Sequence, residues 1–225
     1  GRVLVLLTLD EIEGVQTMLP RLPAGVADEV IAVDGGSTDG TTEILQEHGI
    51  SVVRQRSRGR GEAFRIAVAR TSADCIVFFS PDGNENPEDI ARLFTALDEG
   101  ADMVIASRFL PGSVNEEDEA ALPFRKWANL CFNRVANALW NQGSYVTDTI
   151  NGFRGIRRQA FLDLAPRSVG FTIEYELSIL AMKSGMRIVE IPTVEGQRLG
   201  GETKAPSLRT GLAFVRYLVA EILGH

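Results

Sequence analysis

Short runs of apolar and β-branched residues alternate with longer segments of helical pattern over the first half of the chain. The apolar runs predict five strands, at Val3–Thr8, Glu29–Asp34, Ser51–Arg54, Cys75–Phe79 and Met103–Ala106. The segments between them have the pattern of helices, so the chain predicts βαβ units and an α/β fold with a mostly parallel sheet. Ligands of such sheets bind outside the carboxyl ends of the strands. We therefore expect the functional groups on the loops that follow the strands.

The second half of the chain has a different pattern. A loop with an acidic run at 116–119 precedes a predicted helix over Phe124–Trp140, and another helix is expected near Ile173–Lys183. The last segment, Ser207–Leu223, is apolar over most of its circumference, with Arg209 and Arg216 on one stripe. Such a helix packs into the domain or a partner, which is the favoured interpretation, or lies along a membrane surface.

Length and composition fit one globular domain. The 225 residues are 44% hydrophobic and 24% charged, which excludes a disordered or low-complexity chain. No apolar run approaches the roughly 18 to 20 residues of a membrane-spanning helix, and the start lacks the form of a signal peptide. The first residue is Gly1 rather than Met, which leaves room for a trimmed end and a removed membrane segment.

The charge distribution narrows the possible ligands. A net charge of −7 argues against a general nucleic-acid binder, which needs a basic face. Six arginines nevertheless lie between Arg54 and Arg70, and they form either a phosphate-binding segment or a solvated helix face. Cys75 and Cys131 fit no metal or redox spacing, which suits a reducing, cytoplasmic compartment. The two histidines leave little scope for histidine-led catalysis.

The segment after the second predicted strand has the composition of a ligand-binding loop. It begins with Asp34, continues with two glycines that allow a ligand to approach the backbone, and contains Ser37 to Asp39 as helix caps. A carboxylate next to open backbone suits a nucleoside, and the alternative is a tight turn with a capping box. A dinucleotide site fits less well, because its glycine fingerprint follows the first strand, where this chain has Leu9–Glu13.

Seven short motifs follow one another in an order that is typical of one enzyme family. They are Asp10-Glu11, Val33–Thr41, Arg58–Gly61, Pro87–Ile90, Ala106–Phe109, Asn151–Arg154 and Gly201–Lys204. In this order the chain resembles the family 2 glycosyltransferases of GT-A fold, and more narrowly the polyprenyl-phosphate or dolichol-phosphate mannose and glucose synthases. The resemblance covers nearly the whole chain. It implies one domain over residues 1–225, with a nucleotide-sugar-binding half at 1–110 and an acceptor-side half at 111–225.

The resemblance also implies a role for the loop after the fourth predicted strand. In the family this loop carries Asp-X-Asp, which holds a divalent cation, Mg²⁺ or Mn²⁺, on the diphosphate. Here Ser80 replaces the first acid, so Asp82 and Asn84 are the expected metal ligands, with help from Glu85. We expect the cation to bind weakly without nucleotide. A plain surface turn is compatible with the same residues.

Further site residues are implied in the same way, and this sequence departs from the family pattern at Leu7, Asp10 and Gly35. Glu11 and Asp34 are expected on the ribose and base. The implied catalytic residues are Asp82, Arg108 and Arg125; the implied nucleotide-binding residues are Glu11, Asp34, Gly36, Arg58, Gly61, Arg198 and Lys204; and the implied acceptor-binding residues are Asn129, Arg154 and Glu174.

The expected reaction is an inverting transfer of a hexose from GDP- or UDP-hexose to a dolichyl or undecaprenyl phosphate, with peripheral contact at the cytoplasmic face of a membrane. An ionised phosphate acceptor needs no strong base. A sugar hydroxyl would need one, from Glu174, Asp148 or Asp82, although the first two equally fit carboxylates that orient an arginine. The alternatives are a transferase with a saccharide or other soluble acceptor, a nucleotidyltransferase, and a nucleotide-binding scaffold whose metal loop has decayed.

Overall fold

The computed structural model describes residues 1–115, 118, 124–199 and 207–224. All five predicted strands are present, each within one residue of its predicted ends. They are β1 (Arg2–Thr8), β2 (Glu29–Asp34), β3 (Ser51–Arg54), β4 (Cys75–Phe79) and β5 (Met103–Ser107). The predicted α/β class is therefore confirmed.

Two further strands complete a seven-stranded sheet of order β3-β2-β1-β4-β6-β5-β7. β6 (Arg154–Arg157) lies antiparallel between β4 and β5, and β7 (Ile188–Pro192) pairs in parallel with β5. The sequence pattern predicted neither strand. Because β6 is antiparallel, the chain enters it from the carboxyl edge of the parallel strands, which places the residues before Arg154 at that edge.

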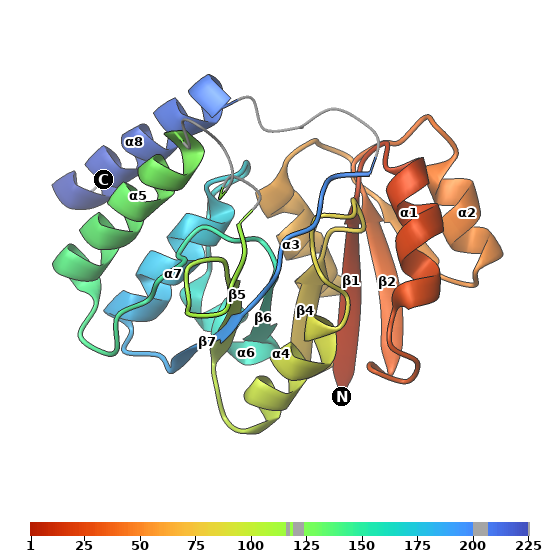
Figure 1. Ribbon diagram of the computed structural model, residues 1–225, viewed down its shortest axis with the longest axis horizontal. Helices are drawn as coiled ribbons and strands as arrows, with labels where there is room; N and C mark the ends of the chain where they lie inside the picture. Colours follow the sequence, from red (N-terminus) through yellow and green to blue (C-terminus); the bar gives the residue numbers. More distant parts are fainter. Residues whose placement is uncertain (116–117, 119–123, 200–206, 225) are drawn as a thin grey trace.

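Alternate side chains of β1 supply both faces of the core. Val3, Val5 and Leu7 belong to one buried cluster, and Leu4 and Leu6 belong to the other. Helices cover each face, giving three layers (Figure 1). The helices α1 (Ile12–Met18), α2 (Thr41–Glu47) and α4 (Asp89–Asp98) pack on one face, and α3 (Arg60–Arg70), α6 (Arg158–Leu164) and α7 (Ile173–Lys183) pack on the other. A short 3₁₀ helix, η1 (Leu19–Arg21), follows α1.

The helices α5 (Phe124–Trp140) and α8 (Ser207–Leu223) lie side by side at the end of the molecule opposite α1 and α2 (Figure 1). Phe214 of α8 packs on Phe132 of α5 and on Tyr175 of α7, with ring centroids 5.4 and 5.5 Å apart. The favoured expectation that the last helix packs into the domain is therefore confirmed. None of the described helices is long and apolar enough to cross a membrane.

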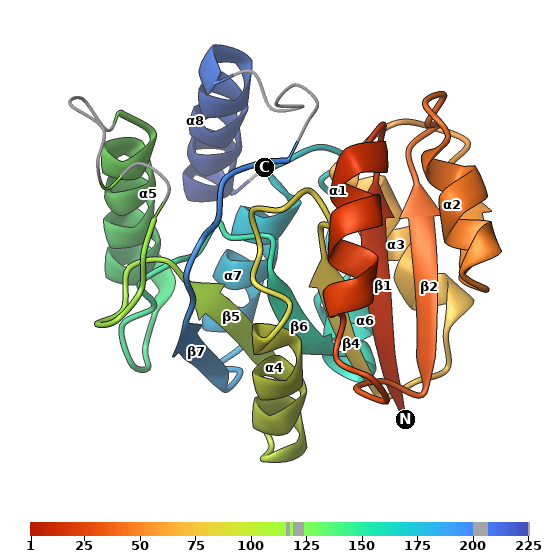
Figure 2. The ribbon, with the colours of Figure 1, turned by 45° about the vertical axis from the view of Figure 1, so that its right-hand side comes forward.

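The sheet has a topological switch point between β1 and β4. β2 and β3, which follow β1 in the chain, lie on one side of β1. β4 pairs with β1 on its other side, also in parallel. The loops that follow β1 and β4 therefore emerge side by side at the carboxyl edge, seen at the top of Figure 2. Crevices at such points bind ligands in open α/β sheets.

Candidate active site

Asp82 lies in the loop directly after β4, at the switch point. One of its carboxylate oxygens accepts a hydrogen bond from the Asn84 backbone N–H at 3.1 Å. A segment near the C-terminus runs beside this loop, since the Leu199 N–H donates to the Asp82 carbonyl at 2.7 Å and the Gly196 N–H donates to the Asn84 carbonyl at 2.8 Å. The loop is thus fixed from two sides, with the Asp82 side chain 14% exposed.

Arg198, on that adjoining segment, joins the loops after β1 and β4. Its guanidinium donates to Asp82 Oδ2 at 2.9 Å and also to a carboxylate oxygen of Glu11, the residue that precedes α1. Arg198 Nε is buried and has no hydrogen-bond partner among the described residues. A partly exposed guanidinium whose buried Nε has no partner in the described part of the chain is suited to bind an anionic oxygen.

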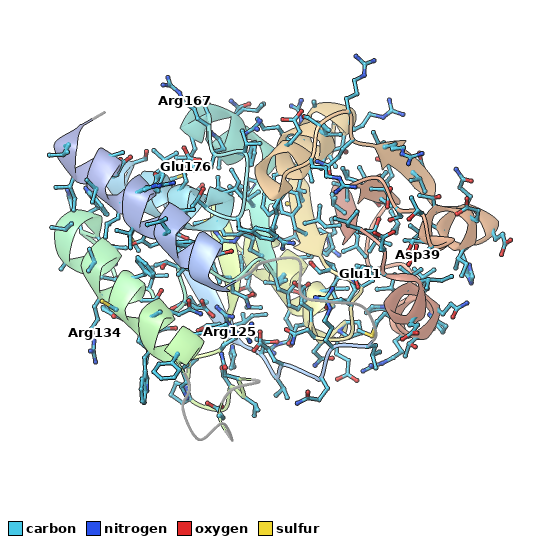
Figure 3. All side chains as sticks on the ribbon, turned by 90° about the horizontal axis from the view of Figure 1, so that it is seen from above. Glu11, Asp39, Arg125, Arg134, Arg167 and Glu176 are labelled. Atoms are coloured by element: carbon cyan, nitrogen blue, oxygen red, sulfur yellow. The ribbon has the colours of Figure 1, made fainter. Side chains whose placement is uncertain are left out.

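A cavity of about 400 Å³ opens beside this ion-pair network. Its wall combines the loop after β4, the N-terminal parts of α3 and α7, and one side of α5 and α8. Of the predicted site residues, it brings together Asp82, Asn84, Arg108, Arg125, Asn129, Glu174 and Arg198. Glu11 touches this group through Arg198. Figure 3 views the carboxyl edge from above, with Glu11 on the α1 side and Arg125 on the α5 side.

Arg108 supplies a preorganised cation on the α5 side of the cavity. Its Nε and Nη2 donate to the two oxygens of Asp148 at 2.7 and 2.9 Å, and its Nη1 lies 3.6 Å from Glu195. Burial opposes the charge of Arg108, but the two carboxylates outweigh burial and raise its pKa. Asp148 therefore orients an arginine, which is one of the two roles that the sequence analysis gave it; the other was a general base. Arg125 and Asn129 of α5 complete this side.

Two more carboxyl groups near the cavity have raised pKa values. Burial raises the pKa of Glu85 to about 8, helped by Asp82 and opposed by Arg60. Burial likewise raises the pKa of Glu195 to about 7, where Asp148 adds to the effect and Arg108 opposes it. Titratable groups perturbed in this way cluster at functional sites.

An ion pair that the sequence analysis did not identify lies between the two sides of the cavity. Arg60, at the start of α3, donates through Nε to Glu174 Oε1, and both residues line the cavity. Burial by itself would lower the pKa of Arg60. The charges of Glu174 and Glu85 outweigh burial and raise the pKa, so the guanidinium stays charged. The pair joins residues 114 positions apart, which no local spacing could have indicated.

Asp34 ends β2, as predicted, and is held by hydrogen bonds from its own turn and from β1. It is fully buried, and its oxygens accept hydrogen bonds from the Gly36 and Ser37 N–H groups and from the hydroxyls of Thr8 and Ser37. Asp34 does not line the cavity that Asp82 lines, and its expected contact with the ribose and base stays a prediction. Both loops lie at the same sheet edge, but Asp34 shapes its own turn, and Glu11 makes the link to Asp82.

Three other predicted residues also lie away from the cavity lining. Gly36 belongs to the Asp34 turn, with φ of +102°, and Arg58 is exposed in the loop before α3. Gly61 allows α3 to approach the backbone of 168–169, where its N–H donates to the Val169 carbonyl at 2.8 Å. The nucleotide contact expected of these three residues stays a prediction. Lys204 lies outside the described residues.

Arg154 is a core residue rather than an acceptor ligand. Its guanidinium is fully buried and donates to the carbonyls of Asn151, Glu174 and Thr149. Burial lowers its pKa to about 10. The predicted direct acceptor contact is wrong for this geometry, and Arg154 instead fixes the backbone that carries Asn151 and Glu174 to the cavity wall.

The loop after β4 offers oxygen ligands but not a complete metal site. No group of three or more His, Cys, Asp or Glu side chains within the described ranges could hold a metal ion. Asp82 and Asn84 supply the hard oxygens that Mg²⁺ and Mn²⁺ favour. These residues therefore fit a cation whose remaining ligands come from a bound phosphate and water.

Comparison with known proteins identifies the family of this chain. The sequence model described as "Glycosyl transferase family 2" matches residues 21–164 of this chain. The chain belongs to glycosyl transferase family 2. Undecaprenyl-phosphate mannosyltransferase of Micrococcus luteus is 31% identical to this glycosyltransferase over 229 residues, covering 95% of this chain and 91% of the relative. Glycosyltransferase AglJ of Haloferax volcanii is 33% identical over 81% of this chain, which spans only 59% of AglJ.

A solved structure confirms the GT-A fold of this family 2 glycosyltransferase. Glucosyl-3-phosphoglycerate synthase from Mycobacterium tuberculosis, in complex with Mn²⁺ and UDP-glucose, has a TM-score of 0.71 and 25% sequence identity. The match covers 99% of this chain and 78% of the synthase. The same synthase is also known in complex with Mg²⁺ and UDP. Members of this fold thus bind a nucleotide with a divalent cation.

Proposed function

We propose that this glycosyltransferase transfers a hexose, with inversion, from a nucleoside diphosphate sugar to the phosphate of a polyprenyl phosphate at the cytoplasmic face of a membrane. The observation that carries the proposal is the arrangement of the cavity, which has Asp82 and Arg198 on one side and Arg108 on the other. Both substrates of this reaction carry phosphate, and each side offers a guanidinium to bind one.

On the donor side, Arg198 is the group proposed to bind the diphosphate. Its unsatisfied Nε gives it a donor for a phosphate oxygen, and Glu11 and Asp82 hold the guanidinium in place. A divalent cation fits this side, with Asp82 and Asn84 as its protein ligands, as the complexes of the fold relative with Mn²⁺ and Mg²⁺ support. When bound, it would add positive charge against the departing diphosphate.

On the acceptor side, Arg108 and Arg125 would orient the lipid phosphate. A phosphate monoester is largely ionised near neutral pH, so its oxygen can attack the anomeric carbon without a strong general base. The chain would contribute alignment of the two substrates and stabilisation of the leaving diphosphate. Asp148 accepts two hydrogen bonds from Arg108 and so fixes its guanidinium before the acceptor binds. The Arg108 side chain would then need little rearrangement on binding.

The apolar surface next to the acceptor side favours a lipid. Thr210, Gly211 and Phe214 of α8 line the cavity. From there α8 continues with an exposed row that we name the α8 apolar stripe, and its members are 46 to 55% exposed: Leu212, Val215, Val219 and Ile222. Phe124 and Trp127 of α5 are also exposed. Exposed apolar residues on a helix that also lines the cavity suit an isoprenoid chain held in a membrane.

A phosphorylated soluble acceptor is the second candidate. Glucosyl-3-phosphoglycerate synthase, whose structure also includes phosphoglyceric acid in one complex, shares the fold. The same Arg108 chemistry would bind such a phosphate, but the α8 apolar stripe would then have no role in catalysis.

The two candidates are separated by where a radiolabelled sugar goes. The purified chain is incubated with UDP- and GDP-hexoses, Mn²⁺ or Mg²⁺, and either undecaprenyl phosphate in detergent or 3-phosphoglycerate. Label that enters the organic phase with only the lipid acceptor supports the proposal. Label in the aqueous product instead supports the soluble acceptor, and nucleotide binding without any transfer would indicate a scaffold.

A further inference from the structure

Glu190 interrupts the apolar pattern of β7, the strand at one edge of the sheet. The other residues of this strand are Ile188, Val189, Ile191 and Pro192. Ile188, on the same face of the strand as Glu190, packs against the core cluster to which the buried residues of α7 belong. A partly buried carboxylate in such a place lowers stability unless donors satisfy it, so its partners indicate its role.

The Glu190 carboxylate accepts three hydrogen bonds from two consecutive residues. The backbone N–H groups of Thr147 and Asp148 both donate to it at 2.8 Å, and the Thr147 hydroxyl donates to it at 2.9 Å. The Thr147 hydroxyl oxygen also lies 2.6 Å from the hydroxyl oxygen of Ser107, the last residue of β5. Glu190 therefore fixes the backbone of 147–148 from β7, and the Ser107 contact fixes it to the end of β5.

The segment that Glu190 holds carries the partner of Arg108. Asp148 is fully buried and accepts a hydrogen bond from the backbone N–H of Arg108 at 3.1 Å, in addition to the two from its guanidinium. Because an aspartate side chain is short, the backbone of 147–148 determines where the two Asp148 oxygens lie. The contacts therefore run from Glu190 through Asp148 to Arg108, which lines the cavity. A displacement of about 1 Å at a supporting residue can reduce a reaction rate by about a hundredfold.

We propose that Glu190 is a positioning residue for the acceptor phosphate. It holds the backbone that directs Asp148 at Arg108, and so it keeps the Arg108 guanidinium in the orientation in which a phosphate can bind. Glu190 itself does not line the cavity, and both of its oxygens accept hydrogen bonds from 147–148. This inference rests on the proposed function, in which Arg108 binds the acceptor phosphate. It adds a residue outside the cavity to the groups that determine acceptor binding.

A double-mutant cycle in the whole chain tests the route from Glu190 to Arg108. Glu190→Gln keeps the size of the side chain, but one of its acceptor oxygens becomes an NH₂ group that faces a donor. This change is made alone and together with Asp148→Asn. Each variant is assayed for transfer from the UDP- or GDP-hexose that the wild type uses to undecaprenyl phosphate, with either substrate varied. Asp102→Asn is the matched control, because Asp102 accepts the Arg187 N–H at 2.8 Å at the opposite end of the β5–β7 pair.

We expect Glu190→Gln to raise the acceptor KM by about fivefold or more and to leave the donor KM within about twofold of wild type. In the Asp148→Asn background, Glu190→Gln should add less than about twofold, because the contact through which it acts is already lost. Asp102→Asn should keep both KM values of the wild type.

Two results would overturn the inference and leave the proposed function intact. One is a lower melting temperature and kcat in Glu190→Gln with both KM values unchanged, which indicates a purely structural role. The other is a pair of effects that multiply in the double variant, which indicates that Glu190 acts independently of Asp148. A wild type that transfers no hexose to the lipid phosphate would overturn both proposals.

A second variant covers the case in which Glu190→Gln does not fold, as judged by its melting temperature. Thr147→Val removes only the hydroxyl that joins Glu190 to Ser107 and leaves the two backbone hydrogen bonds in place. We expect it to raise the acceptor KM by about twofold to threefold with the donor KM unchanged. An unchanged acceptor KM in this variant would likewise overturn the inference.

Discussion

Arg198 donates a hydrogen bond to Asp82 at 2.9 Å, although 116 positions separate the two residues. The same guanidinium reaches Glu11, so one side chain joins the loops after β1 and β4 at the sheet's switch point. Three parts of the chain that are far apart in sequence thereby form one polar edge of the cavity.

Arg198→Lys should raise the donor KM by about tenfold or more, because a lysine point charge cannot bond both carboxylates and also present a fixed donor to phosphate. The measurement is steady-state transfer with varied nucleotide sugar and saturating acceptor. Arg187→Lys is the control, since Arg187 donates to the Glu99 carbonyl at the opposite edge of the sheet. An unchanged donor KM in Arg198→Lys would remove Arg198 from the donor site.

Gly14→Ala should disturb the loop after β4 without touching any charged group. A Cβ on Gly14 of α1 would overlap the Pro81 carbonyl oxygen and lie 2.9 Å from Asp82 Cα, and both of these are backbone atoms. We expect a loss of about 1 to 3 kcal/mol in stability and at least a tenfold loss of transfer. Thermal melts and transfer rates are compared with Gly143→Ala, whose nearest contact is an ordinary 3.6 Å. Equal behaviour of the two variants would contradict the tight packing of α1 on this loop.

Charges on the α8 apolar stripe should abolish membrane contact. The double variant Val215→Glu/Val219→Glu introduces two charges where apolar side chains are exposed, at a cost of several kcal/mol in membrane affinity. We expect loss of co-sedimentation with anionic vesicles and unchanged melting temperature. Leu162→Glu, an exposed position on α6, is the control and should sediment as wild type. Vesicle binding that survives in the double variant would remove this role from α8.

Glu195 predicts a specific pH dependence of stability. Burial raises its pKa from 4.5 to about 7 in the folded protein, so between these pH values the folded chain holds a proton that the unfolded chain has released. The free energy of unfolding should therefore fall as pH rises from about 5 to about 7, by at most about 1.4 kcal/mol per pH unit for this one group. Urea unfolding across this range should give a shallower slope for Glu195→Gln. Parallel curves for the two proteins would contradict the raised pKa.

The sequence predicted the five strands of the first half because their apolar, β-branched runs are bounded by polar loops. It did not predict β6, since Arg154-Gly155-Ile156-Arg157 has the composition of a surface loop. The strand forms because backbone carbonyls satisfy the Arg154 guanidinium in the core, an arrangement that depends on α7 and on the residues before β6. That compensation is tertiary and leaves no local pattern.

The candidate site was predicted best where a charge follows a strand. Arg108 comes directly after β5 and Asp82 lies in the loop after β4, and both line the cavity. Asp34 also ends a strand, but its hydrogen-bonding capacity is used by its own turn, which the sequence could not distinguish from a nucleoside contact. Arg60 and Glu174 lie on helices, and their pairing arises only when α3 and α7 pack on the same face of the sheet.

The most direct test is a crystal structure with an unreacted nucleoside diphosphate sugar analogue, Mn²⁺ and a short-chain polyprenyl phosphate. We expect the diphosphate within hydrogen-bonding distance of Arg198 and next to Asp82, and the lipid phosphate on Arg108 with its chain leaving toward α8. A diphosphate bound elsewhere, with the Asp82–Arg198 contact unaltered and Arg108 free of phosphate, would contradict the proposed function.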